Sequence, residues 1–145
     1  MTRDAAHVPV MADACLEALR PGPGRWIVDA TFGAGGHARA LLDAGANVFA
    51  IDRDPGAAER AAAIGDDRLR FALGDFRDLE RLLAAHDVPA PDGILMDLGV
   101  SSMQLDEAER GFAFRHEGPL DMRMSSEGRS AADLVAEASE AELAA

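Results

Sequence analysis

Apolar residues along the chain gather in short runs and in stripes at helical spacing. Apolar runs at 26–29, 47–51 and 93–97, with an alternating run at 69–73, predict strands. Apolar spacing and helix-starting or helix-stopping residues predict helices at 11–19, 36–44, 55–64 and 76–85. Strands that alternate with helices predict an α/β fold with a mostly parallel sheet and flanking helices. The run Ile94-Leu95-Met96 is typical of a strand buried on both faces.

The pattern changes after Asp97. Residues 98–128 have glycines and scattered charges without a clear period, while apolar residues such as Phe112 and Phe114 favour an ordered, packed loop. Ser130 is expected to cap a short helix that reaches about residue 136. Ser139 and Glu142 form a capping box, which predicts the start of another helix.

The glycine-rich turn after the first predicted strand is the strongest candidate for chemistry. Gly33, Gly35 and Gly36 allow a sharp turn and a close approach to backbone N–H groups. The next helix starts near His37, with the positive end of its dipole at that turn. Asp52 ends the second strand, about 20 residues beyond the first glycine, where an acid can bind ribose hydroxyls. The first hypothesis is therefore an adenosine-containing ligand.

Each of these features also has a plainer interpretation. With Ala38, the turn fits the GxGxxG/A pattern of nicotinamide-dependent oxidoreductases, and an ordinary tight turn is the less favoured alternative. Asp52 could cap the helix at 55–64, although Asp54 competes for that role more directly. Phe76 has a spacing that fits the core.

Composition narrows the class of protein. The chain has 145 residues, 48% of them hydrophobic, and a formal net charge of −12. This favours one domain with a core and argues against broad, sequence-independent binding to nucleic acid. Cys15 is the only cysteine, so no disulfide framework and no cysteine-rich metal site are expected. No apolar run has the length of a membrane span or a signal peptide, which predicts a soluble, cytoplasmic protein without a membrane partner.

Several runs of residues together carry a resemblance to a known family. They lie at 29–37, 50–55, 92–102, 104–106, 109–112 and 118–124. These runs closely resemble the bacterial cytosine-N4 methyltransferases of small-subunit ribosomal RNA, the RsmH or MraW family, and the likeness extends from His7 to the end. The resemblance implies a class I, S-adenosylmethionine-dependent, Rossmann-like fold. It also implies methylation of a cytosine amine in the decoding region of 16S ribosomal RNA, with the 30S subunit as partner.

The resemblance implies the site residues as well. The family's positions for its cofactor, S-adenosyl-L-methionine, fall on Gly35, Gly36, His37, Asp52, Phe76, Asp97 and Gln104. The loop N–H groups are expected to hold the methionine carboxylate, Asp52 the ribose hydroxyls, and Phe76 to flank the adenine. Many amino-methyltransferases carry an Asp/Asn/Ser-Pro-Pro-aromatic motif after strand four, and it is absent here. Asp97 or the adjoining backbone carbonyls are therefore the candidate catalytic groups that accept hydrogen bonds from the cytosine amine. No metal is expected.

The length of the chain departs from the family, whose members are roughly double this size. The chain is therefore expected to be a fragment, truncated after strand four. It would hold a cofactor-binding core over 1–128 and the start of a helical insertion over 129–145. With the strand order 3-2-1-4-5 of this fold, the missing fifth strand would leave Ile94-Leu95-Met96 on an uncovered edge. We therefore expect poor solubility or inactivity from this chain alone.

Other functions and contacts stay open at this point. A non-catalytic remnant that binds S-adenosylmethionine and an NAD-dependent oxidoreductase are the two alternatives. Arginines in the irregular segment could contact RNA phosphates or pair with neighbouring acids. These arginines are Arg110, Arg115, Arg123 and Arg129, and the acids are Glu107, Glu109, Glu117 and Asp121. The sequence gives no oligomeric state.

Overall fold

Residues 9–125 and 127–144 are described by a computed structural model of the chain. Over these residues the chain divides into two compact units, one ending at Leu98 and the other beginning at Gly99. His7, where the family resemblance starts, lies outside the described residues. The predicted domain boundary at residue 128 stays a prediction.

The first unit is built on a parallel sheet. Its strands are β1 (Trp26–Asp29), β2 (Asn47–Asp52), β3 (Leu69–Leu73) and β4 (Gly93–Leu95). Over the described residues their order is β3-β2-β1-β4, and each neighbouring pair is parallel. The central strand β1 pairs Trp26 with Asn47 of β2 and Ile27 with Gly93 of β4. The predicted α/β fold and the predicted order of the first four strands are confirmed.

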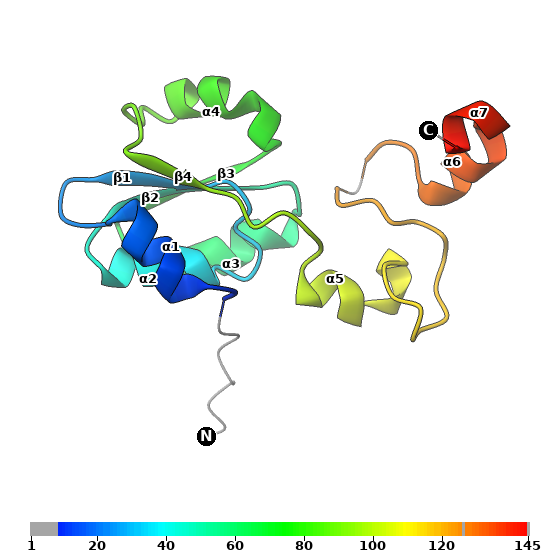
Figure 1. Cartoon of the computed structure of the whole chain (residues 1–145), viewed down its shortest axis with the longest axis horizontal. Helices are drawn as coiled ribbons and strands as arrows, with labels where there is room; N and C mark the ends of the chain where they lie inside the picture. The colour runs from blue at the N-terminus through cyan, green and yellow to red at the C-terminus, as the bar shows by residue number, and fades with distance from the viewer. Residues whose placement is uncertain (1–8, 126, 145) are drawn as a thin grey trace. The chain divides into compact units, whose positions relative to one another are not determined.

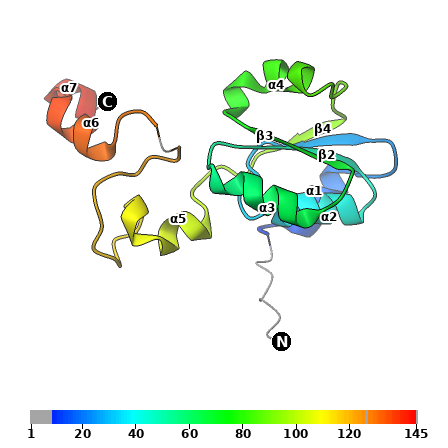
Figure 2. The same ribbon diagram turned by 180° about the vertical axis from the view of Figure 1, so that it is seen from behind.

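Helices cover both faces of this sheet. Figures 1 and 2 show α1 (Ala12–Leu19), α2 (Gly36–Asp43) and α3 (Gly56–Ile64) on one face. The other face is covered by α4 (Leu79–Ala85), which follows a short 3-10 turn, η1 (Phe76–Asp78). The first three helices differ from their predicted bounds by a single residue at one end, which is within the uncertainty of helix termini.

The core is divided between the two faces of the sheet. Side chains along β2 alternate: Val48 and Ala50 pack in the cluster that includes α2 and α3, while Phe49 and Ile51 pack in the cluster that includes α4. All four are fully buried. This period of two is the geometry of a strand. Because helices cover both faces, the central strands have continuous apolar sequences.

The edge strand β4 differs from its prediction. The predicted strand 93–97 ends at Leu95, and Ile94 and Met96 are 44% and 47% exposed, so burial on both faces was wrong. The reason is position, because over the described residues β4 pairs with β1 alone. The apolar edge expected from the chain length is present.

The second unit contains short helices. They are α5 (Ser102–Asp106), the 3-10 turn η2 (Ala108–Arg110), α6 (Ala131–Glu137) and α7 (Glu140–Leu143). The predicted cap at Ser130 and the predicted capping box of Ser139 with Glu142 are both confirmed. The prediction missed α5, although Ser101 and Gln104 form the S-x-x-Q pattern of a capping box. In the described parts of both units, no helix is long and apolar enough to span a bilayer.

The exposed β4 edge gives a prediction about self-association. We expect Ile94→Lys to reduce self-association of the chain, because a charged side chain disfavours edge-to-edge pairing of strands. The free energy of unfolding should change by about 1 kcal/mol or less, since Ile94 is 44% exposed. Sedimentation velocity over a range of concentrations measures the effect.

The matched control is Leu134→Lys, at a residue 47% exposed on α6. Both variants lower the net negative charge equally, so greater charge repulsion cannot explain reduced association. An equal effect of the two substitutions would contradict the assignment to the sheet edge.

Candidate functional site

Three acids lie at the carboxyl ends of parallel strands. Asp29 ends β1, in register with Ala50 of β2 and Leu95 of β4. Asp52 ends β2, and Asp97 follows β4 by two residues. Parallel strands end at the same edge of a sheet, which is where ligands bind in open α/β folds. The first unit therefore gathers its candidate residues at one edge.

The glycine turn lies at this same edge and is tightly built. Phe32 donates its N–H to the Ile51 carbonyl at 3.0 Å, and Gly35 donates to the Phe32 carbonyl at 2.7 Å. Gly33 and Gly35 have φ angles of +54° and +78°. A Cβ at Gly35 would lie 2.7 Å from Cζ of the buried Phe32 ring. Glycine is therefore required at position 35 for both backbone conformation and space.

Asp52 holds the turn through its carboxylate. Its Oδ2 accepts from the Gly33 N–H at 2.6 Å, and its Oδ1 accepts from the Asp54 N–H at 2.9 Å. The start of α3 is served by Asp54 instead, whose Oδ1 accepts from the Gly56 N–H at 2.9 Å. The interpretation of Asp52 as a helix cap was therefore wrong. Each carboxylate oxygen can accept a further hydrogen bond, so the group can still receive donors from a ligand.

His37 and Gly36 are covered by the segment before α1. His37 is 8% exposed, and its Nε2 lies 3.0 Å from the Val10 carbonyl oxygen. A Cβ on Gly36 would lie 3.3 Å from the Cβ of Pro9. The His37 ring is thus engaged within the protein, and the backbone around it forms the start of α2. Sequence reasoning did not anticipate this cover.

Thr31 connects two of the acids. Asp97 donates its backbone N–H to Thr31 Oγ1 at 2.7 Å, and Thr31 donates its own N–H to Asp29 Oδ1 at 3.2 Å. These contacts fix the end of β4 against the glycine turn. The side chain of Asp97 is exposed. An exposed carboxylate on a fixed backbone can accept a hydrogen bond from an incoming donor.

Asp29 is fully buried at the centre of this group. Its Oδ1 accepts from Thr31, whereas Oδ2 has no hydrogen-bond partner among the described residues. Burial raises the pKa of Asp29 to about 6; the bond from Thr31 and the charge of His37 lower that pKa, while Asp52 and Asp97 raise it further. Burial is the largest of these effects, and the charges of Asp52 and Asp97 add to it. A cationic ligand at this edge would relieve their repulsion.

Phe76 and Gln104 occupy different settings. Phe76 starts η1, is half-buried, and packs against the core cluster that includes α4. It lies near the end of β2, because Gly74 donates its N–H to the Asp52 carbonyl at 2.8 Å. Gln104 belongs to the second unit, where it is 6% exposed and its Oε1 accepts from the Ser101 N–H at 2.9 Å. The structure thus brings all the predicted residues except Gln104 into one unit, and their cofactor roles stay predictions.

The arginines of the second unit are paired with acids. Salt bridges join Arg110 to Glu107, Arg115 to Asp106, Arg123 to Asp121, and Arg129 to Glu137. The predicted pairing is confirmed for Arg110 and Arg123, whereas Arg115 and Arg129 pair with acids that were not predicted.

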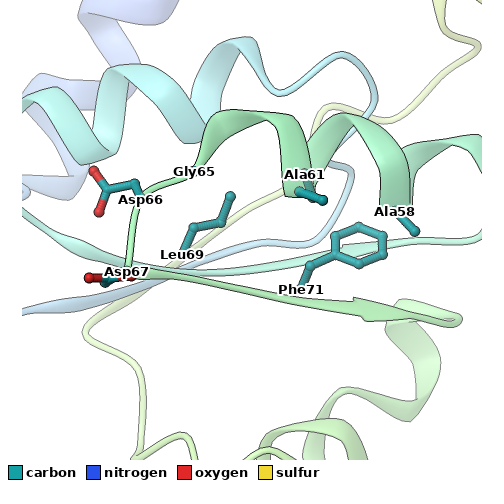
Figure 3. Close-up of a pocket in the computed structure, with 8 residues that line it drawn as sticks. Ala58, Ala61, Gly65, Asp66, Asp67, Leu69 and Phe71 are labelled. Carbon is teal, nitrogen blue, oxygen red and sulfur yellow. The ribbon is translucent and has the colours of Figure 1, made fainter.

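A depression of about 460 Å³ lies elsewhere in the first unit, between α3 and β3 (Figure 3). Ala58, Ala61, Leu69 and Phe71 contribute to its walls, with Asp66 beside them. None of the predicted cofactor residues is among those that line it. The chemistry at the strand ends therefore does not depend on this depression.

Two residues that shape the site were missed from the sequence. Thr31 carries a weak signal, because a hydroxyl in a turn often bonds nearby backbone groups. Arg60 donates its Nε–H to the Gly33 carbonyl at 2.9 Å, from a position 27 residues away. A contact of that separation leaves no local pattern in the sequence.

The fold and the site together define a class of protein. The parallel sheet, the glycine turn after β1 and the acid at the end of β2 are the features of the Rossmann-like fold of class I S-adenosylmethionine-dependent methyltransferases. Residues 4–145 match the model of the MraW methylase family. The chain belongs to that family.

Curated proteins and solved structures include chains that are similar to this one. The ribosomal RNA small subunit methyltransferase H of Sphingopyxis alaskensis is 53% identical over 147 residues, which cover 99% of this chain and 45% of that protein. The protein of the same name from Deinococcus radiodurans is 52% identical, over 97% of this chain and 45% of its own length. The C-terminal domain of precorrin-6Y C5,15-methyltransferase from Rhodobacter capsulatus, a solved structure, has a TM-score of 0.49 and 24% identity, over 66% of this chain and 52% of that one. The chain spans about half the length of the curated relatives it matches.

The geometry of Gly35 gives a prediction about stability. We expect Gly35→Ala to lower the free energy of unfolding by about 2–4 kcal/mol, since left-handed strain adds to overpacking against Phe32. The control is Gly65→Ala, at φ +66° with nothing within 4 Å of the added Cβ. It should cost only about 1–2 kcal/mol. Urea unfolding measures both, and equal losses would contradict the clash.

The raised pKa of Asp29 gives a prediction about pH. Its folded pKa of about 6 exceeds the usual value near 4, so burial of Asp29 costs stability that grows as pH rises from about 4 to 6. Asp29→Asn should therefore match the parent chain near pH 4 and be more stable at pH 7, by up to about 3 kcal/mol. Urea unfolding across this range measures the difference.

The control is Asp75, whose substitution should change stability with pH in the opposite direction. The side-chain bond from Arg77 lowers the pKa of Asp75 to about 2. Asp75→Asn should therefore lose stability at pH 7, and that loss should disappear as pH falls from about 4 to 2. A lower stability of Asp29→Asn at pH 7 would show that the buried carboxylate has a stabilising partner.

Proposed function

We propose that this chain is the cofactor-binding part of an S-adenosylmethionine-dependent methyltransferase. Its substrate is N4 of a cytosine in the decoding region of 16S ribosomal RNA, within the 30S subunit in the cytoplasm. Membership of the MraW methylase family and relatives named ribosomal RNA small subunit methyltransferase H support this proposal. The observation that carries it is Asp52, whose carboxylate lies at the glycine turn with both oxygens oriented by backbone N–H groups.

The residues at the strand ends fit such a cofactor. Asp52 accepts hydrogen bonds from the ribose hydroxyls, and the N–H groups of Gly35, Gly36 and His37 hold the methionine carboxylate. Phe76 flanks the adenine. The buried Asp29 carboxylate, with an oxygen that lacks a hydrogen-bond partner among the described residues, fits a ligand that carries positive charge. The cofactor role predicted for Gln104, a residue of the second unit, stays a prediction.

We propose that the Asp97 carboxylate accepts a hydrogen bond from the cytosine amine. S-Adenosylmethionine, when bound, supplies an electrophilic methyl group. The backbone of Asp97 is fixed by Thr31, and its exposed carboxylate can accept from the amine N–H and so favour a pyramidal nitrogen. Alignment of the amine contributes much of the rate enhancement, as proximity does in other bimolecular reactions. The target base must leave its stack, at a cost of a few kcal/mol.

The two alternative functions fit less well. A nicotinamide cofactor would bring a pyrophosphate to an edge that carries Asp29, Asp52 and Asp97, and the charges would repel. The nearby guanidinium groups of Arg39 and Arg60 donate to loop carbonyls. A non-catalytic remnant that binds S-adenosylmethionine is the second candidate for this chain.

Titration calorimetry of the chain tests the proposed ligand. S-Adenosylhomocysteine should bind and NAD should not, and Asp52→Asn should weaken binding by about 10–100-fold, since a charged hydrogen bond contributes about 1.5–3 kcal/mol. Asp66→Asn is the control, because Asp66 pairs with Arg68 beside the depression in Figure 3. Binding of NAD in place of S-adenosylhomocysteine would overturn the proposal.

A methyl-transfer assay tests the proposed reaction. Small ribosomal subunits are the substrate, and the C-terminal half of a relative is supplied to the chain. Asp97→Asn should abolish transfer while S-adenosylhomocysteine still binds, because the exposed Asp97 carboxylate is proposed to act on the incoming amine. Unchanged transfer in this variant would remove Asp97 as the acceptor, and no transfer by the parent mixture would favour the remnant.

A further inference from the structure

Arg60 reaches from α3 to the glycine turn. Its Nε–H donates to the Gly33 carbonyl at 2.9 Å, and its Nη2 lies 3.8 Å from Asp54 Oδ2. The Nη2 atom is buried and has no hydrogen-bond partner among the described residues. The guanidinium is thus packed into the base of the turn, although the side chain as a whole is 27% exposed.

The Gly33 residue is held from two sides. Its N–H donates to Asp52 Oδ2 at 2.6 Å, while its carbonyl accepts from Arg60. Asp52 in turn accepts from the Asp54 N–H, and Asp54 lies against the guanidinium. These contacts close a ring through Gly33, Asp52, Asp54 and Arg60. The Asp52 carboxylate is therefore connected to Arg60 through both Gly33 and Asp54.

We propose that Arg60 is a positioning residue for the nucleoside site. By holding the Gly33 carbonyl, it fixes the neighbouring N–H that orients Asp52, and so presents the carboxylate in one rotamer to the ribose hydroxyls. The proposal rests on the proposed function for the identity of the ligand. A binding group that is already ordered loses less conformational freedom when its ligand arrives.

The chemistry of arginine suits this position. Its planar group directs Nε to a carbonyl and Nη2 towards a carboxylate from one rigid fork, which a lysine ammonium cannot reproduce. Asp54 lies within ion-pair distance, so it offsets the positive charge. The site can therefore contain Arg60 and still favour a cationic ligand.

The first test uses amide hydrogen exchange, measured by NMR on the whole chain without ligand. Arg60→Met should accelerate exchange of the Gly33 N–H at least tenfold, because the loop loses its hold on the Gly33 carbonyl. The matched control is Arg68→Met. Arg68 likewise donates to a carbonyl, that of Leu42 at 2.9 Å, and pairs with an acid, Asp66. Unchanged Gly33 exchange in Arg60→Met overturns the inference, whatever the chain binds.

The second test is a double-mutant cycle with S-adenosylhomocysteine as the probe, measured by titration calorimetry. Arg60→Met should weaken binding about tenfold in the parent chain and less than twofold in the Asp52→Ala background, since Arg60 acts through Asp52. Arg60→Lys should not restore affinity, and Arg68→Met should leave it unchanged. Equal losses in both backgrounds overturn the inference. Absence of binding by the parent chain overturns the proposed function. In that case, amide hydrogen exchange of Gly33 in Arg60→Met is the test of whether Arg60 is a positioning residue.

Discussion

The hydrogen bond between the Gly33 N–H and the Asp52 carboxylate is the contact on which the candidate site depends. At 2.6 Å it joins the turn after β1 to the end of β2, two segments that the parallel sheet brings to the same edge. A charged acceptor makes such a bond stronger than a bond between neutral groups. The turn can approach the acid closely because Gly33 and Gly35 have positive φ angles and Gly35 leaves room for the Phe32 ring.

The same edge concentrates negative charge at a cost to stability. Asp29 is fully buried, and this burial is the main reason that its pKa is raised, with smaller contributions from the charges of Asp52 and Asp97. A protein tolerates such an arrangement where the site needs it, and perturbed carboxylates in this setting are typical of functional sites. A ligand with positive charge would be favoured at this edge.

The arginines of the irregular segment form salt bridges with acids of the same unit. Arg110, Arg115, Arg123 and Arg129 are each joined to an acid of the second unit, so their hydrogen-bonding capacity is partly used within the chain. Exposed pairs of this kind contribute little to stability. The net charge of −12 argues against broad, sequence-independent binding to nucleic acid.

The sequence by itself determined the sheet, the helices beside it, the glycine turn and the acids at the strand ends, because period, turn residues and motifs are local signals. It also determined the family, since the matching runs extend along most of the chain. Only the tertiary structure decided that Asp52 accepts from the Gly33 N–H, that Ile94 is exposed, and that Arg60 donates to the Gly33 carbonyl. Those facts depend on which strands have neighbours and on contacts between distant residues, and neither leaves a local pattern.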